Sequence, residues 1–255
     1  DSDGPVIAGI TSTDVTCNGG NDGTITVTLV TGGTGTIEYS VDGGSYQASN
    51  VLTGLEAGNH LVVVRDQNGC TGEFTIQLFE PSAISAIVTA SNVFCFGSAT
   101  GSLSVVAGGG QGTLAYSIDG VNFQSTPQFN NLTAGTYTVT VKDAGQCSVQ
   151  VVVTITQPNA IGLFAGALNV SCNGGSDGAI NATAIGGTGM ILYSVDGINW
   201  QTSGFFSNLG AADYELYAQD ATGCTRNITI TVFEPDALIT SSIVSNVSCI
   251  RGDNG

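Results

Sequence analysis

Apolar and polar residues alternate along several short segments of the chain, the pattern of a β-strand with one buried face. The segment Thr24–Val30 (TITVTLV) alternates Thr with aliphatic residues, and Ser102–Ala107 and Ala179–Ile185 follow the same pattern. Further strands are predicted at Thr138–Lys142 and Val149–Thr156. No segment has the 3.6-residue period of an amphipathic helix. The chain is therefore expected to be all-β.

Turn signals separate these segments. Gly-Gly pairs stand at residues 32–33, 109–110 and 186–187, and Asp-Gly pairs stand at residues 42–43, 119–120 and 196–197. Gly accepts the positive φ that tight hairpin turns require. About seven short strands per unit, with turn signals roughly every 8–12 residues, predict an Ig-like or fibronectin-III-like β-sandwich.

The chain repeats itself with a period of 77 to 78 residues. Seven cysteines mark the period, because steps of 52 or 53 residues alternate with steps of 25: Cys17, Cys70, Cys95, Cys147, Cys172, Cys224 and Cys249. The sequence predicts repeats at residues 1–80, 81–157 and 158–234, and the start of a fourth at residues 235–255. We expect tandem sandwiches arranged as an extended rod, excerpted from a longer protein.

Each repeat has an early and a late cysteine, and regular cysteines without a CxxC pair predict disulfides formed in an oxidising compartment. Pairing within a repeat is preferred, since it leaves only Cys249 unpaired; the bonds would be Cys17–Cys70, Cys95–Cys147 and Cys172–Cys224. The alternative is pairing between consecutive repeats, Cys17–Cys147 and Cys95–Cys224. It follows from geometry, because the two loops lie at opposite ends of a seven-stranded sandwich.

Composition and charge reduce the number of function classes expected for this chain. The 255 residues include 20 acidic and 4 basic side chains, for a net charge of −16. We therefore expect no nucleic-acid partner, and without an apolar run of about 20 residues we expect no membrane insertion. The single histidine, His60, aligns with Tyr137 and Tyr214 at a tyrosine-corner position. We expect no catalytic residue and no enzyme activity.

The remaining candidates are aromatic and acidic side chains. Five tyrosines are expected to be structural: Tyr39, Tyr116, Tyr193, Tyr137 and Tyr214. Asp22, Asp66 and Asp177 lie in oxygen-rich loops, which makes them weak calcium ligand candidates, although Asx-turn formation is the preferred role. No other cofactor or metal is expected. The aromatic rings of Tyr46, Phe123 and Trp200 would be exposed if each repeat bound a ligand at its loop end.

The combined motifs resemble SprB repeats, the tandem modules of large Bacteroidota surface adhesins. They include Cys-Asn-Gly-Gly-x-Asp-Gly-x-Ile at Cys17–Ile25 and Cys172–Ile180, Tyr-Ser-Val-Asp-Gly, and the phrase Asn131–Asp143. The segments Phe96–Gly101 and Ala211–Asp220, and Gln146-Cys147 in place of Gly-Cys, depart from the pattern. The resemblance implies a filamentous protein secreted by the type IX system and exposed on the bacterial cell surface, in a family that includes gliding adhesins.

The function expected from these observations is a structural stalk segment of such an adhesin. Its partners would be neighbouring repeats of the same long chain, with surface glycans or matrix engaged through other regions. Two alternatives are a glycan- or protein-binding sandwich module, and a subunit of an extracellular filament or sheath that associates laterally through β edges.

Overall fold

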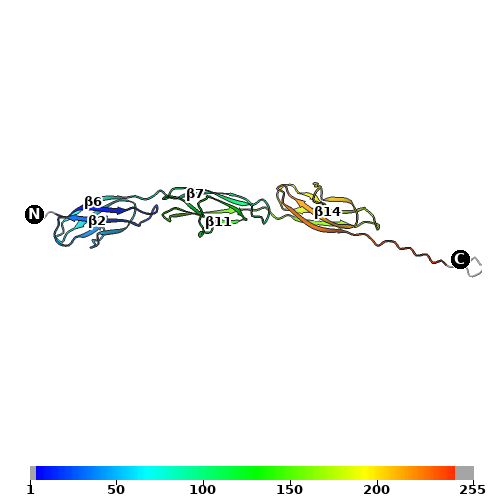
Figure 1. Ribbon diagram of the computed structural model, residues 1–255, viewed down its shortest axis with the longest axis horizontal. Coiled ribbons are helices and arrows are strands. Elements are labelled where there is room, and N and C mark those ends of the chain that lie inside the picture. The colour runs from blue at the N-terminus through cyan, green and yellow to red at the C-terminus, as the bar shows by residue number, and fades with distance from the viewer. Residues whose placement is uncertain (1–3, 245–255) are drawn as a thin grey trace, which may run out of the picture. The chain divides into compact units, whose positions relative to one another are not determined.

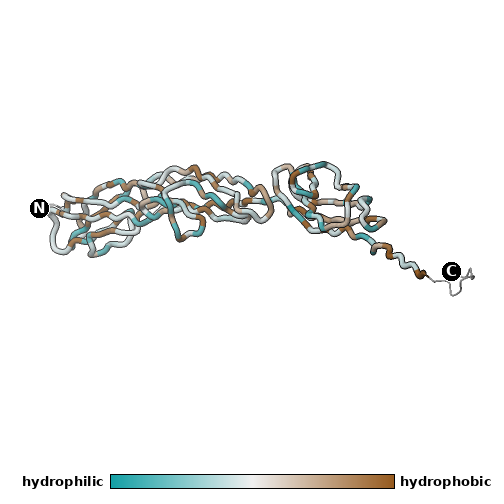
Figure 2. The backbone as a smooth tube through the Cα atoms, turned by 45° about the vertical axis from the view of Figure 1, so that its right-hand side comes forward, coloured by the Kyte–Doolittle hydropathy of each residue, from teal (hydrophilic) through white to brown (hydrophobic). Residues whose placement is uncertain are grey.

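The computed structural model describes residues 4–244, and every regular element in this part of the chain is a β-strand. The predicted all-β class is confirmed. Figure 1 shows strands joined by loops, with no helical ribbon among the described residues. Apolar and polar positions are interspersed along the strands, without long apolar runs (Figure 2). No helix of these residues is long and apolar enough to cross a membrane.

The chain divides into two compact units. Among the described residues, the first contains residues 4–92 and 101–155, and the second contains residues 93–100 and 156–244. Cys249 and the rest of residues 245–255 lie outside the described residues, as do residues 1–3. The predicted repeat boundaries stay a prediction.

Strands β1 to β6 of the first unit form a sandwich of two three-stranded antiparallel sheets. One sheet has the order β1-β2-β4 and the other has the order β3-β5-β6. The strands are β1 (Val6–Thr13), β2 (Gly23–Thr31), β3 (Glu38–Val41), β4 (Val51–Leu55), β5 (Gly58–Arg65) and β6 (Thr71–Leu78). Labelled A, B, C, E, F and G, they give the sheets ABE and CFG, an Ig-like arrangement without strand D.

The same topology recurs in the next six strands of the first unit. Their sheets have the orders β10-β8-β7 and β12-β11-β9. The strands are β7 (Ser85–Ser91), β8 (Gly101–Gly108), β9 (Ala115–Ser117), β10 (Gln128–Leu132), β11 (Gly135–Lys142) and β12 (Ser148–Ile155).

The second unit contains the third copy, with sheets β13-β14-β16 and β15-β17-β18. Its strands are β13 (Gly162–Leu168), β14 (Gly178–Ile185), β15 (Leu192–Ser194), β16 (Phe205–Leu209), β17 (Ala212–Gln219) and β18 (Thr225–Val232). Each copy thus has six strands instead of about seven. Between the Asp-Gly turn and the fourth strand of each copy, the chain pairs only through one isolated bridge: Tyr39↔Gln47, Tyr116↔Gln124 or Tyr193↔Gln201.

The alternating residues supply the core between the two sheets. In the first sandwich, Ile25 of β2 packs in one cluster with Val62 and Val64 of β5, and all three are fully buried. Leu103 and Ile180, at the positions of Ile25 in the other two copies, are also fully buried. The hydrophobic pattern of the strands therefore predicts the buried face in each copy.

The glycine that begins the second strand of each copy is required by close packing. A Cβ at Gly101 would lie 2.9 Å from the carbonyl oxygen of Leu132 and 2.9 Å from Cγ2 of Ile155. A Cβ at Gly178 would lie 2.7 Å from the carbonyl oxygen of Leu209. Since real Cβ contacts are longer, only glycine fits there, which explains the Gly of the Asp-Gly-x-Ile motif.

Candidate functional site

A buried aspartate shapes the turn that carries each late cysteine. Asp66, Asp143 and Asp220 follow β5, β11 and β17, and their exposed fractions are only 4%, 2% and 4%. In every copy the aspartate Oδ1 accepts the backbone N–H of the cysteine four residues later, at 2.9 Å. These carboxylates are buried because backbone donors satisfy them.

The second carboxylate oxygen holds the Gly-Gly turn against the same site. Asp66 Oδ2 accepts the N–H of Thr34 at 2.9 Å, and Asp143 Oδ2 accepts the N–H of Gln111 at 2.8 Å. Asp220 Oδ2 accepts the N–H of Thr188 at 2.8 Å. Burial alone would raise the pKa of Asp220, but hydrogen bonds from Thr222 and from backbone amides outweigh it and lower that pKa. The aspartate therefore fixes two loops at once.

The residue before each late cysteine has a positive φ. Gly69 and Gly223 adopt φ of 84° and 87°, and Gln146 adopts φ of 68°. Glycine reaches this region freely, whereas for a residue with a Cβ the conformation costs about 1–2 kcal/mol. The substitution of Gln for Gly before Cys147 is therefore strained but leaves the turn unchanged.

The loop that carries each early cysteine is held by an acceptor from the end of the same copy. Glu80 Oε2 accepts the N–H of Gly19 at 2.6 Å, and Glu234 Oε2 accepts the N–H of Gly174 at 2.8 Å. In the second copy, the Gln157 side-chain oxygen accepts the N–H of Gly97 at 2.8 Å. Sequence reasoning missed these acceptors, although each stands directly before a proline that keeps the repeat period.

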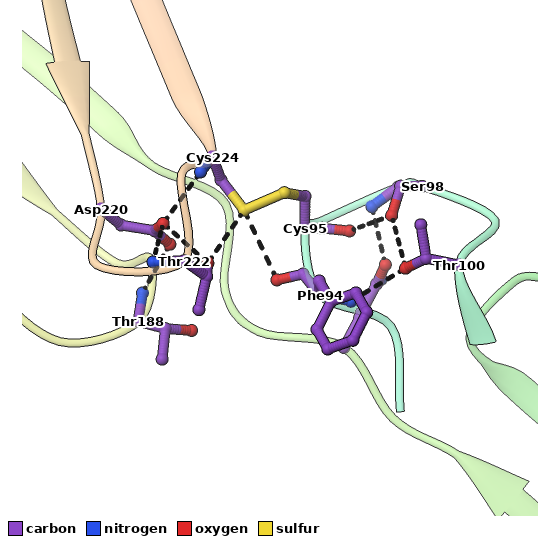
Figure 3. Close-up of a disulfide and its surroundings, with 10 residues drawn as sticks. Phe94, Cys95, Ser98, Thr100, Thr188, Asp220, Thr222 and Cys224 are labelled. Atoms are coloured by element: carbon purple, nitrogen blue, oxygen red, sulfur yellow. Dashed lines mark hydrogen bonds between the residues drawn. A yellow bond between two sulfur atoms is a disulfide. The ribbon is translucent and has the colours of Figure 1, made fainter. Parts of the chain in front are cut away.

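Two disulfides join cysteines of consecutive repeats. Cys17 bonds Cys147 and Cys95 bonds Cys224, each with a Cα–Cα distance of 5.6 Å. Figure 3 shows the second bond, with Phe94 and Cys95 facing the turn of Asp220, Thr222 and Cys224. The preferred pairing within a repeat is wrong, and the alternative pairing is the one observed. Disulfides of this kind are typical of proteins exported to an oxidising compartment.

The early and late cysteines of one copy do not pair because the last strand of the copy separates them. Asn18 Nδ2 donates to Glu80 Oε1 at 2.8 Å, so the early loop lies at the end of β6. Cys70 directly precedes β6, which has eight residues. A strand of that length extends about 26 Å, far beyond the roughly 7 Å that separates bonded Cα atoms. The early and late cysteines of one copy therefore lie at opposite ends.

Cys70 and Cys172 carry no disulfide among the described residues, and both are exposed. They are the late cysteine of the first copy and the early cysteine of the third. Both belong to the predicted set of disulfide cysteines, together with Cys249, which lies outside the described residues.

The three calcium candidates act as backbone acceptors. Asp22 Oδ1 accepts the N–H of Thr16 at 2.9 Å, and Asp177 Oδ1 accepts the N–H of Ser171 at 3.0 Å. The side-chain hydroxyls of Thr16 and Ser171, and then these backbone N–H groups, lower the pKa of Asp22 and Asp177. Asp66 holds the late-cysteine turn. No group of three or more His, Cys, Asp or Glu side chains is gathered for a metal ion within residues 4–244.

His60 replaces a tyrosine at a corner where the ring bonds a backbone carbonyl. Tyr137 and Tyr214 donate their hydroxyls to the carbonyls four residues earlier, at 2.9 and 3.0 Å. His60 Nε2 makes the same contact with the Glu56 carbonyl at 2.9 Å, and Nδ1 lies 2.6 Å from Asp42 Oδ2. Burial opposes protonation, but both partners favour the charged ring and raise the pKa of His60.

The loop aromatics are half-buried and contact side chains of the neighbouring strand. The Arg65 guanidinium lies 3.9 Å from the ring centre of Tyr46, and the Lys142 ammonium lies 4.1 Å from that of Phe123. Trp200 instead meets Tyr217 edge-on, with ring centres 6.4 Å apart. These contacts hold the rings on the sandwich surface and form no aromatic platform.

The other tyrosines lie at the third strand of each copy. Tyr116 is buried, and Tyr39 and Tyr193 are half-buried beside the sandwich cores. The Tyr193 hydroxyl accepts the N–H of Ala184 at 3.0 Å.

Comparison with known protein families finds one match, which recurs in each copy. Three segments match the SprB repeat, at residues 9–46, 87–123 and 167–199. Each segment contains the early cysteine of its copy and ends before the late cysteine. No curated protein matches the chain.

Solved structures that resemble the chain include multi-domain Ig proteins at low identity. The N-terminal eight Ig domains of Down Syndrome Cell Adhesion Molecule isoform 1.30.30 are 12% identical over 92% of this chain and 37% of that one, with a TM-score of 0.38. Sidekick-1 immunoglobulin domains 1–5 are 11% identical over 90% of this chain and 58% of that one, with a TM-score of 0.31. The surface layer protein SbsC, domains 1–6, is 12% identical over 92% and 41%, with a TM-score of 0.27. The chain thus spans less than two thirds of each of these structures.

Proposed function

We propose that this chain, three segments of which match the SprB repeat, is a stalk segment of a large secreted adhesin exposed on the bacterial cell surface. In this role the repeats carry no catalytic site; they hold an adhesive region away from the cell and transmit force to it. Gliding is one process that would use such a stalk.

One observation carries the proposal: the disulfides join consecutive repeats. A disulfide within a sandwich would stabilise that sandwich alone. A bond such as Cys17–Cys147 instead gives the array a second covalent connection between neighbours. Such a connection is useful to a protein that is pulled along its length.

The charge and the loops are consistent with this role. A net charge of −16 with only 4 basic residues keeps copies of the chain apart and leaves few cleavage sites for trypsin-like proteases. The ring atoms of His60, the single histidine, are engaged with Asp42 and Glu56. The half-buried Tyr46, Phe123 and Trp200 give the ligand-binding alternative no exposed platform.

Single-molecule force spectroscopy tests force transmission. Between Cys17 and Cys224 the backbone has 207 residues, whereas the path through both disulfides crosses only the 52 residues from Cys95 to Cys147. The 155 bypassed residues, at about 3.5 Å each, correspond to roughly 540 Å of hidden length. We expect this length to appear only when a reductant is added. Equal extension with and without reductant would contradict the proposal.

Small-angle scattering tests the rod. A compact globule of 255 residues has a radius of gyration of about 18 Å. Three sandwiches in a line, each with strands of about 26 Å plus loops, would reach about 100 Å and a radius of gyration of about 30 Å. A value near that of the globule would overturn the stalk proposal.

A further inference from the structure

Cys70 and Cys172 lie in loops built like those of the four bonded cysteines. This likeness concerns hydrogen bonds and backbone conformation as well as sequence. The two cysteines are also complementary in type, because Cys70 is a late cysteine and Cys172 is an early one.

The Cys70 turn is complete without its disulfide. Asp66 Oδ1 accepts the N–H groups of Cys70 and Asn68 at 2.9 and 3.0 Å, and Gly69 has φ of 84°. The Asp66 N–H donates to the Cys70 carbonyl at 3.0 Å, as in the bonded copies with Asp143 and Asp220. The buried aspartate, not the disulfide, therefore shapes this turn.

The Cys172 loop shares several hydrogen bonds with the loop of bonded Cys17. The N–H of Gly175 donates to the Cys172 carbonyl at 2.9 Å, as Gly20 does to Cys17. Asn173 Nδ2 donates to the Pro235 carbonyl at 3.1 Å, as Asn18 does to Pro81. Both loops are thus preformed in the geometry that the bonded copies use.

The observed bonds follow one rule, in which the early cysteine of a repeat bonds the late cysteine of the next. We propose that Cys70 and Cys172 each form a disulfide of this inter-repeat type with a further repeat of the same kind. Cys172 would bond the late cysteine of a repeat that follows, and Cys70 would bond the early cysteine of a repeat that precedes. The inference rests on the proposed function and extends it to a continuous disulfide ladder.

The chemistry requires a two-electron oxidant, for which a small-molecule disulfide such as oxidised glutathione suffices. The thiolate of one cysteine attacks a glutathione sulfur and releases one glutathione thiol. The thiolate of the second cysteine then attacks the mixed disulfide and releases another. Two thiols become one disulfide, and one glutathione disulfide becomes two glutathiones.

A tandem fusion of the chain with itself tests the rule, because it gives Cys172 a following repeat. Residues up to Asp236 of the first copy are joined directly to Pro5 of the second, with Cys249→Ser in the second copy. Cys172 and the Cys70 that follows it are then 130 positions apart. The two observed bonds span 130 and 129 positions.

The readout is the number of cysteines outside protein disulfides, counted as alkylated plus glutathionylated thiols, in the monomeric, non-reduced fusion after oxidation by glutathione. The single chain with Cys249→Ser has two free thiols and serves as the reference. We expect two in the fusion as well, although it contains twice as many copies of Cys70 and Cys172. Trypsin and Glu-C should also release peptide 66–73, whose one cysteine is Cys70, linked to a peptide that contains Cys172.

Four alkylated or glutathionylated cysteines in the fusion would overturn the inference, provided that Cys17–Cys147 and Cys95–Cys224 form in both copies. A control fusion with Cys172→Ser in the first copy must yield no linked peptide. Scattering from the single chain decides the stalk proposal separately, so failure of one is distinguishable from failure of the other.

Discussion

Replacing both Cys17 and Cys147 with Ser should destabilise the first unit and leave the third sandwich unchanged. The bond closes a loop of 130 residues, and it constrains the unfolded chain more than the folded one. The chain-entropy relation gives about 5 kcal/mol for a loop of this length. If one sandwich unfolds while its neighbour stays folded, the freed loop is about half as long, and the relation gives about 4 kcal/mol.

The assay is equilibrium unfolding in guanidinium chloride without reductant, followed by two probes. Far-UV circular dichroism reports all sandwiches, whereas the emission of Trp200, the one tryptophan, reports the third. We expect the double variant to lose about 4 to 5 kcal/mol in the dichroism transition of the first unit, with the Trp200 transition unmoved. The matched control, Cys95→Ser with Cys224→Ser, should shift the Trp200 transition.

Two results would refute this reasoning. A loss below about 1 kcal/mol in the first unit would mean that the bond constrains little of the unfolded chain. An equal shift of the Trp200 transition in both double variants would mean that the effect is not local to the joined sandwiches.

Three further predictions concern single side chains. His60 has a raised pKa in the folded state, so its contribution to stability should be complete below about pH 6.5 and lost as pH rises through the folded-state pKa. The measurement is the thermal unfolding midpoint as a function of pH, and His60→Tyr should remove the dependence in this pH range. Asp143→Ala should cost about 1–3 kcal/mol in denaturant unfolding, because it leaves the backbone N–H groups of Gln111 and Cys147, in part-buried hydrogen bonds, without their acceptor. The matched control, Asp236→Ala, removes an exposed carboxylate and should be neutral. Gln146→Gly should stabilise the chain by up to about 1 kcal/mol in the same assay, since glycine adopts the positive φ of this position without strain. Gly223→Gln should destabilise the chain by a similar amount.

The strands and the repeat could be predicted from the sequence because both depend on local patterns. The alternation in Thr24–Val30 places Ile25 in the core, and the spacing of the cysteines sets the period. The disulfide partners could not be chosen so directly. They depend on the length of β6, which separates the two cysteine loops of a copy, and on which loops of consecutive copies meet.

The roles of the acidic residues were harder to predict, because the same carboxylate can bind a cation or cap a turn. The sequence places Asp66 in a predicted turn, but its burial and the backbone N–H groups that donate to it are visible only in the structure. Glu80 was missed because its partner, Gly19, is 61 residues away.

The two disulfide loops overlap, since Cys95 lies inside the loop closed by Cys17 and Cys147. A single backbone cut anywhere between residues 17 and 224 is therefore spanned by at least one disulfide. A protease that nicks one exposed loop cannot separate the two ends of the chain. The overlap makes the array tolerant of damage, and at least two events, such as a cut and a reduction, are needed to sever it there.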